Sequence, residues 1–154
     1  MGMPSDQSPQ TDGAWVFFQF RADGAEVRCA LQQVQSRLRG QLAPDDVGAL
    51  ELALAEVLNN IIEHAYAGQV PGQVSVSVAR SARDNALVCR IEDDGQPMPG
   101  LTLPEGRMQP VADRTEDLAE GGWGWALIRA LTRDISYRRS GNRNQLQFHL
   151  PLTA

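Results

Sequence analysis

The chain of 154 residues contains no lysine, and its 14 basic side chains are all arginines. Walker-type phosphate loops and the protein-kinase fold both place a lysine on the phosphates, so the sequence excludes both. Schiff-base chemistry is excluded for the same reason, because it requires a lysine amine. Any cation that meets a phosphate on this protein must therefore be an arginine or a bound metal ion.

Cysteine is scarce as well. Cys29 falls in a predicted helix and Cys89 in a predicted strand, with no CxxC pair and no histidine close to either in the sequence. This spacing supports neither a metal site nor a disulfide framework. We expect two free, buried thiols.

Long apolar runs and basic clusters are missing too. No stretch approaches the roughly 20 apolar residues that cross a bilayer, and the polar start MGMPSDQSPQTDG lacks the basic and apolar parts of a signal peptide. The net charge of -5 and the absence of a basic run argue against binding to nucleic acid. We therefore expect a cytoplasmic protein that binds neither membranes nor nucleic acid directly.

The remaining composition is that of one ordinary globular domain. Residues 1–13 are rich in Pro, Ser, Gln and Asp, which predicts a disordered tail before a single domain over residues 14–154. The apolar periodicity predicts both strands and helices. These are a strand at 15–20, helices at 22–39 and 44–66, a hairpin of 74–80 and 86–92, a helix after Gly124, and a hairpin of 135–138 and 145–150.

Three polar residues of the second predicted helix recur at steps of four: Glu56, Asn60 and His64. The apolar residues around them fit the helical template, and the polar row lies beside the apolar stripe, at the border of core and solvent. An acid, an amide and an imidazole on one groove wall suggest chemistry on a phosphate. The alternative is an ordinary solvated face with a histidine against the core, and the helix alone does not decide between them.

Two glycine-bearing segments favour a nucleotide site. Asp93, Asp94 and Gly95 follow a predicted strand, where a carboxylate can accept a hydrogen bond from an exocyclic amine and glycine lets the chain turn against a flat ring. The segment GGWG at 121–124 precedes a predicted helix, where backbone N–H groups and the positive helix end can approach a phosphate. An ordinary Asp-Gly turn and a flexible helix entry are the alternatives.

The segment between these glycines, residues 96–121, contains four prolines and little apolar periodicity. Loops of this length without their own structure are usually functional lids or disordered insertions. Its position between two candidate ligand-binding segments favours a lid.

The order of these motifs resembles the GHKL ATPase superfamily: Glu-x3-Asn-x3-His on a helix, Asp-x-Gly after a strand, a long lid, and Gly-x-Gly at a helix start. The small size, the N-terminal strand and helix, and the sequence after Asp134 are similar to the anti-sigma factor serine kinases of the RsbW/SpoIIAB type. The resemblance implies an α+β fold, a two-layer α/β sandwich whose sheet is mixed but mostly antiparallel, with helices on one face. It also implies ATP and Mg²⁺ as cofactors.

The resemblance further implies a role for each motif residue. Glu56 would be the general base that takes the proton of a substrate serine, and Asn60 would hold the Mg²⁺ that bridges the phosphates. Asp93 would bind the adenine amine, and His64 would either steady the metal side of the helix or simply pack. The other implied nucleotide contacts are Gly95, Arg114, Gly122, Trp123 and Gly124.

Two positions depart from the family pattern. Pro97 stands where the first glycine segment often has a second glycine, and Glu120 stands where kinase members place an arginine that meets the terminal phosphate. A carboxylate there repels phosphate unless the lid brings Arg114 or Arg107 inward. ATP binding is therefore better supported than catalysis.

The leading hypothesis is an ATP-dependent protein-serine/threonine kinase and anti-sigma factor that phosphorylates a STAS-type anti-anti-sigma partner. A sigma factor is then a second partner, part of the partner surface is the helix 22–39, and a homodimer is expected by analogy. The alternative is a catalytically weak or inactive ATP-binding module that sequesters a partner without phosphotransfer. The catalytic domain of a two-component histidine kinase fits less well, because the chain has no dimerisation helix with a phosphoacceptor histidine.

Overall fold

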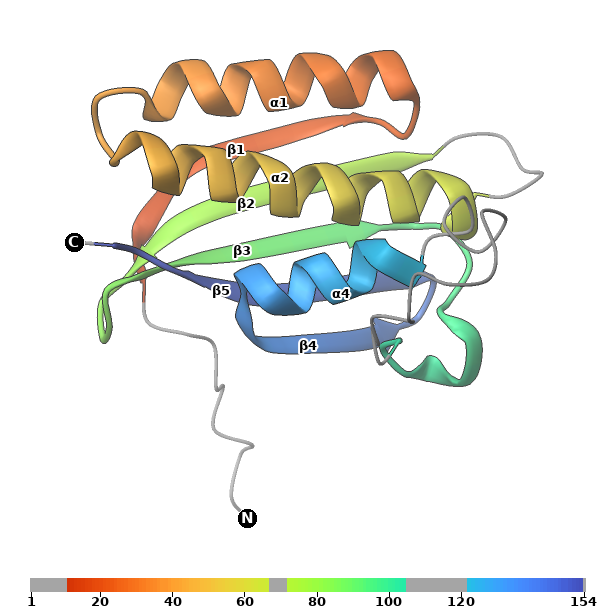
Figure 1. The fold of residues 1–154 in the computed structure, drawn as a ribbon. Helices are drawn as coiled ribbons and strands as arrows, with labels where there is room; N and C mark the ends of the chain where they lie inside the picture. Colours follow the sequence, from red (N-terminus) through yellow and green to blue (C-terminus); the bar gives the residue numbers. More distant parts are fainter. Residues whose placement is uncertain (1–10, 67–71, 105–121, 154) are drawn as a thin grey trace, which may run out of the picture.

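A five-stranded sheet and a layer of helices make up the fold (Figure 1). The computed structural model describes residues 11–66, 72–104 and 122–153. The strands lie in the order β1-β2-β3-β5-β4, and α1, α2 and α4 lie side by side across one face of the sheet. This arrangement confirms the two-layer α+β fold that the resemblance implies. All strand pairings among the described residues are antiparallel.

In the described residues, none of the helices is long and apolar enough to cross a membrane.

Short connections join the elements in the described parts of the chain. The elements are β1 (Thr11–Arg21), α1 (Gly24–Leu38), α2 (Pro44–Asn60), η1 (Ile61–Ala65), β2 (Gln73–Ser81), β3 (Ala86–Asp93), η2 (Pro99–Leu101), α4 (Gly122–Leu131), β4 (Arg133–Ser140) and β5 (Arg143–Pro151).

The strand β1 starts earlier than the apolar pattern predicts. It begins at Thr11, inside the segment expected as a tail, whereas the aromatic run begins at Trp15. Thr11 and Ala14 pair with Ser81 and Ala79 of β2, across a shift in register. Because backbone hydrogen bonds form whatever side chains are present, pairing with β2 extends β1 into polar sequence.

The helix α1 is bounded by local signals in the sequence. Asp23 caps its start by accepting a hydrogen bond from the backbone N–H of Glu26 (N to Oδ1, 2.8 Å), and Gly40 beyond its end has a positive φ of 85°. Cys29 lies off the buried stripe and is exposed, so the expectation of two buried thiols is wrong for Cys29 and confirmed for Cys89. The buried stripe of α1 consists of Val27, Ala30, Val34 and Leu38.

The core lies between α2 and the inner face of the sheet. Leu50, Leu54 and Leu58, which follow one another at helical spacing on α2, are fully buried. Burying a side chain of this kind contributes about 1.5–3 kcal/mol, so this stripe fixes α2 firmly over the sheet. The buried sheet residues of the same core include Val76, Val78, Cys89, Ile91 and Phe148.

The last turn of the second predicted helix is not α-helical. α2 ends at Asn60, and Ile61–Ala65 form the π-helical turn η1. A π turn closes its hydrogen bonds from i to i+5 and is wider than an α turn, so it rotates the residues beyond it away from the positions that steps of four predict. Glu56 and Asn60 keep their shared face, whereas His64 lies in the π turn.

Candidate functional site

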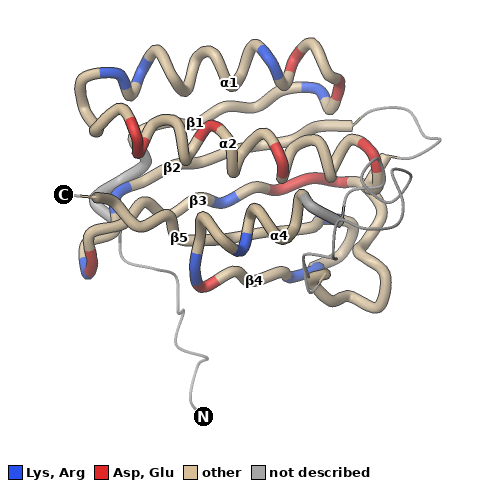
Figure 2. The backbone as a smooth tube through the Cα atoms, viewed as in Figure 1, with Lys and Arg blue, Asp and Glu red and all other residues tan. Residues whose placement is uncertain are grey.

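The segments that the sequence singles out meet at one end of the sheet. There η1 follows the end of α2, β3 ends at Asp93, and α4 begins at Gly122 (Figure 1). α2 and α4 pack against each other. Figure 2 shows acidic residues along α2 and at the end of β3, with arginines on β4 at the same end of the sheet.

Gly124 brings the start of α4 against the polar row of α2. A β-carbon on this glycine would lie 2.8 Å from Glu56 Oε2, 3.7 Å from Asn60 Nδ2 and 3.8 Å from Asn60 Oδ1. The first distance is too short for a real contact, so a larger residue at position 124 would have to displace Glu56. The structure thus places Glu56, Asn60 and Gly124 in one cluster.

Asn60 carries a buried polar atom that the chain does not satisfy. Its amide nitrogen Nδ2 has no hydrogen-bond partner among the described residues. An unpaired buried amide costs free energy, and such groups need an explanation such as a bound water or ion. Rotation of the side chain exchanges the amide nitrogen and oxygen, and an amide oxygen is a ligand that Mg²⁺ accepts. The residue therefore fits the metal-binding role that the resemblance implies.

A metal at this place would need ligands beyond the side chains of the described residues. Among the described residues, no three His, Cys, Asp or Glu side chains are grouped as metal ligands. Mg²⁺ usually keeps several waters and is bound through one or two protein groups together with substrate phosphates. The cluster therefore fits a metal ion that shares its ligands with a phosphate compound.

Asp93 ends β3 and is 4% exposed. Its Oδ1 accepts hydrogen bonds from the backbone N–H of Gly95 (2.9 Å) and from Asn144 Nδ2 (2.8 Å). Burial raises the pKa of this carboxyl above its ordinary value, although the hydrogen bonds from Asn144 and Gly95 oppose the shift. Within the described residues Oδ2 accepts no hydrogen bond. This second oxygen is thus the acceptor available to an amino group.

The turn after β3 rests on the π turn. A β-carbon on Gly95 would lie 2.6 Å from the carbonyl oxygen of Ala65, and the backbone N–H of Gln96 donates to that same oxygen (2.8 Å). Backbone atoms cannot move aside as the end of a flexible side chain can, so position 95 requires glycine. Gly95 therefore joins the Asp93 segment to the helix that carries Asn60.

Tyr66 also holds the turn after β3, through hydrogen bonds of its hydroxyl. No motif in the sequence predicts it as a site residue. Its hydroxyl is hydrogen-bonded to the carboxylate of Asp94, accepts from the backbone N–H of Asp94 (3.1 Å), and lies 3.2 Å from the carbonyl oxygen of Gln73. Burial and the bond to Asp94 raise the pKa of Tyr66 far above its ordinary value, so the hydroxyl keeps its proton at neutral pH.

Asn144 is a second residue that the sequence motifs do not predict. It directly follows the turn of the last predicted hairpin, which gives no hint of a site. The pairing of β5 with β3 places it opposite Asp93, and its amide also contacts Tyr137 and Arg139 of β4. Only the strand order therefore reveals it.

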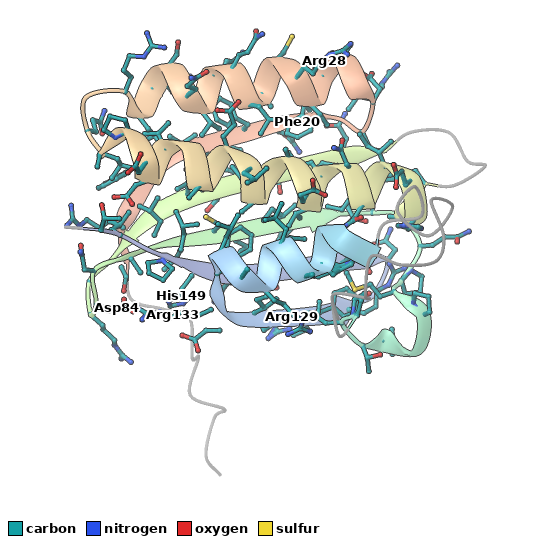
Figure 3. All side chains as sticks on the ribbon, in the orientation of Figure 1. Phe20, Arg28, Asp84, Arg129, Arg133 and His149 are labelled. Carbon is teal, nitrogen blue, oxygen red and sulfur yellow. The ribbon has the colours of Figure 1, made fainter. Side chains whose placement is uncertain are left out.

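The first part of the expected lid, residues 96–104, is attached to α4 and β4. Arg129 of α4, labelled in Figure 3, donates from Nε (3.1 Å) and Nη2 (2.7 Å) to the carbonyl oxygen of Pro104. The backbone N–H of Met98 donates to the hydroxyl of Tyr137 (3.0 Å). Residues 105–121 lie outside the described residues, so a lid over 96–121 stays a prediction.

The remaining predicted nucleotide contacts stay predictions. The side chain of His64 is 65% exposed, and its Nε2 lies 4.0 Å from Glu63 Oε2. Gly122 and Trp123 begin α4, but the side chain of Trp123 is outside the described part of the structure. Arg114 also lies outside the described residues, as do Arg107, Glu120 and Gly121.

Known proteins are similar to this chain in sequence and in fold. Residues 20–150 match the family model for the histidine kinase-like ATPase domain. The chain is 31% identical over 105 residues to the serine/threonine-protein kinase BtrW of Bordetella bronchiseptica, which covers 68% of each chain. It is 28% identical over 115 residues to the anti-sigma F factor of Bacillus subtilis, which covers 71% of this chain and 75% of that protein.

A solved structure has the same fold. The crystal structure of the RsbU and RsbW domains of Rv1364c from Mycobacterium tuberculosis matches 89% of this chain with a TM-score of 0.59 and 18% sequence identity. The match spans 32% of that longer chain, and at this identity it speaks for the fold alone. Because the family model covers most of the sequence and the motif residues meet in space, this chain belongs to the histidine kinase-like ATPase domain family.

Proposed function

We propose that the protein is an ATP-dependent protein-serine/threonine kinase and anti-sigma factor that phosphorylates a STAS-type anti-anti-sigma partner. The observation that carries the proposal is the cluster of Glu56, Asn60 and Gly124, where a carboxylate, an amide and the start of a helix meet. Phosphoryl transfer requires a positioned nucleophile, a metal and compensation of charge at one place. The similarity to a serine/threonine kinase and to anti-sigma factors supports this class.

ATP binding uses the two segments that Gly95 and Gly124 hold against α2 and η1. Asp93 would accept a hydrogen bond from the adenine amine at Oδ2, and Asn60 would help to hold the Mg²⁺ that comes with the nucleotide. The start of α4 offers backbone N–H groups and the positive end of the helix to a phosphate. Each of these roles uses a group that the described part of the chain leaves available.

Glu56 acts as the general base in this proposal. It is half-buried and shares the face of α2 that Asn60 occupies, so it stands beside the side chain expected to hold the metal. The carboxylate takes the proton of a serine hydroxyl as that oxygen attacks the terminal phosphate, and ADP leaves. Glu56 is no phosphate ligand itself, because like charges repel.

The negative charge of the site must be offset, and the chain has no lysine for this purpose. Mg²⁺ offsets part of it. The only basic residues of segment 105–121 are Arg107 and Arg114, and we expect one of them to meet the terminal phosphate. Glu120, directly before the glycines, works against them. Phosphotransfer should be measured for Arg107→Gln and Arg114→Gln, and the variant that loses it identifies the arginine that meets the terminal phosphate.

The partner surface includes α1. This helix lies at the edge of the helical layer, and Arg28, Cys29 and Arg37 are exposed on it (Figure 1). A sigma factor and the STAS-type protein would compete for the surface, so phosphorylation of the STAS partner would decide which one is bound. A homodimer is expected by analogy with similar proteins.

The experiment that tests the proposal separates ATP binding from transfer. Asn60→Ala should weaken Mg²⁺-dependent ATP binding in calorimetry, whereas Asn59→Ala, on an exposed neighbour in the same helix, should not. Glu56→Gln should keep ATP affinity and abolish transfer of labelled phosphate to a STAS-type protein. Glu63→Gln serves as its control, because Glu63 is exposed. Full transfer by Glu56→Gln would remove Glu56 as the base.

A second candidate function is an ATP-dependent module that sequesters a partner without phosphotransfer. Glu120 favours it, because a carboxylate stands where kinase members carry an arginine. ATP binding that Asn60→Ala weakens, together with no transfer by the wild type, would select this alternative.

A further inference from the structure

Asn144 of β5 lies opposite Asp93 of β3 and is 6% exposed. Its Nδ2 donates to Asp93 Oδ1 (2.8 Å) and to the carbonyl oxygen of Gln96 (2.8 Å). Its Oδ1 accepts from the hydroxyl of Tyr137 (2.5 Å) and from Arg139 Nη1 (3.0 Å). A single buried amide thus connects the end of β3, the turn after it, and β4.

The neighbours of this amide determine which of its ends faces Asp93. Arginine has donors and no acceptor, so Arg139 requires the amide oxygen of Asn144 on its side. The amide nitrogen then faces the carboxylate of Asp93. Because Asn144 and the backbone N–H of Gly95 both donate to Oδ1, rotation of the carboxylate would break two hydrogen bonds. Oδ2 is therefore held in one direction.

We propose that Asn144 is a positioning residue that determines the preference of this site for a 6-amino purine over a 6-oxo purine. The inference rests on the proposed ATP site and adds to it a residue that acts through Asp93. An amino group donates to Oδ2, whereas the carbonyl of a 6-oxo purine presents lone pairs to it. Discrimination therefore needs a carboxylate that is both ionised and fixed, and the donor of Asn144 favours both conditions.

The charge on Asp93 depends on groups from four elements of the fold. Asp94, in the following turn, disfavours ionisation, and Arg139 on β4 favours it. Tyr66, just beyond η1, is uncharged and bonds to Asp94. Asn144 on β5 is the side chain that donates directly to Asp93 within the described residues. A change at position 144 therefore acts on the charge of Asp93 first.

Asn144→Asp tests this role, because it keeps the size of the side chain and an acceptor for Arg139 and Tyr137. It replaces the donor by a second carboxyl beside Asp93. Two carboxyls at hydrogen-bond distance share one proton, and while they share it, the new carboxyl can donate to Asp93, whereas the carbonyl oxygen of Gln96 loses its donor at every pH. Above the upper pKa of the pair both are ionised, and they repel each other.

The measurement is calorimetric binding of ATP and of inosine triphosphate, both with Mg²⁺, from about pH 5.5 to 8.5. Wild type should prefer ATP throughout this range. The variant N144D should bind ATP nearly as wild type at low pH and about tenfold more weakly at high pH, with its preference over inosine triphosphate reduced in parallel. Recovery at low pH also shows that the variant is folded.

A matched control lies on the same strand. Gln147 accepts from Nε and Nη2 of Arg90 (3.2 and 3.0 Å) and, three residues from Asn144, points to the opposite face of the sheet. Gln147→Glu adds the same charge to β5 and should leave both pH profiles as in wild type. Asn144→Leu removes the donor at every pH and should lose the preference for ATP throughout.

The outcomes separate the inference from the proposed function. If wild type prefers ATP and N144D shows the same preference with the same pH profile, the inference about Asn144 is wrong and the proposed function stands. Wild type that binds neither nucleotide would overturn the proposed function and the inference together. A high-pH loss of ATP preference in N144D, absent in Q147E, supports the role of Asn144.

Discussion

The polar groups at the two ends of the sheet have different partners. At the end away from the site, Asp84 forms an ion pair with Arg133, and Asp46 accepts from the backbone N–H (3.2 Å) and hydroxyl (3.0 Å) of Thr153. At the site end, Asn60 Nδ2 and Asp93 Oδ2 have no hydrogen-bond partner among the described residues. Both polar groups of the site end belong to residues that the family resemblance assigns to a nucleotide, whereas Asp84 and Asp46 are paired with residues of the chain itself.

His149 is a partly buried polar residue at the end of the sheet away from the site. Figure 3 shows it beside Asp84 and Arg133. Its Nδ1 is also buried without a hydrogen-bond partner in the described residues, but it lies 3.9 Å from Asp84 Oδ2. The chain therefore places an acidic neighbour near His149.

The largest effect is expected for Asp93→Asn. Gly95 and Asn144 both donate to Oδ1, so the amide oxygen of the variant takes that place and its nitrogen faces the adenine amine, donor against donor. ATP affinity should fall roughly 10- to 100-fold, as when a hydrogen bond to a charged group is lost. Calorimetric titration with ATP measures this, and unchanged affinity would remove Asp93 from adenine recognition.

The free energy of unfolding of Asp93→Asn should not fall with its ATP affinity. Burial raises the pKa of Asp93 in the folded protein, so its protonated form stabilises the fold below the unfolded pKa. That contribution is lost as pH rises through the folded pKa, because the ionised carboxylate is the less favourable buried form. Chemical unfolding at pH 7 should therefore show the variant to be at least as stable as wild type, despite its loss of ATP binding.

The next effect concerns glycines in two settings. Gly95→Ala places a β-carbon against the backbone of Ala65, and overpacking of this kind costs about 1–3 kcal/mol. Gly48→Ala is the control, because it lies in α2 with nothing within 4 Å of a β-carbon, and it should stabilise the protein by about 0.4–1 kcal/mol. Denaturant unfolding measures both. Equal changes in unfolding free energy would mean that the turn after β3 moves away from η1 without cost, and that the contact between Gly95 and Ala65 does not contribute to stability.

Side-chain spacing explains which features of the fold are predictable. Burial alternates along most of β2 and in the second half of β3, and the leucines of α2 repeat with helical period, so both features appear in the sequence. The same period places Glu56 and Asn60 on one face. The glycine at position 124 completes the cluster, and it is predictable because glycines directly ahead of an apolar helical pattern mark a candidate anion-binding helix start.

The features that escape prediction depend on backbone geometry or on distant pairing. Ala65, at the end of the π turn, and Tyr66, just beyond it, are both buried, as the apolar spacing of an α-helix would also predict. Apolar spacing therefore does not distinguish the two helix types. Asn144 meets Asp93 across 51 positions of sequence, through a β3–β5 pairing that neither predicted hairpin contains. The strand order is a property of the whole sheet, and no local pattern encodes it.

A moderate effect is expected when one hydroxyl is removed at each end. Tyr66→Phe removes the hydroxyl that holds Asp94, and Thr153→Val removes the one that holds Asp46. Each should cost about 0.5–1.5 kcal/mol of unfolding free energy. Only Tyr66→Phe should also weaken ATP binding, because the turn with Asp93 lies next to Asp94. Weaker ATP binding by Thr153→Val would show that the two ends are coupled.

The smallest effect is expected for Asp84→Asn, since Asp84 is about one-third exposed and surface ion pairs contribute little. A hydrogen bond from Ser81 and the charge of Arg133 lower the pKa of Asp84 in the folded protein. Its contribution to stability is therefore present above the unfolded pKa of about 3.9 and lost as pH falls through the lower folded value. The thermal unfolding midpoint of wild type should exceed that of the variant at neutral pH, and the difference should close in acid and shrink in high salt. ATP affinity should not change, because Asp84 lies at the end of the sheet away from the site.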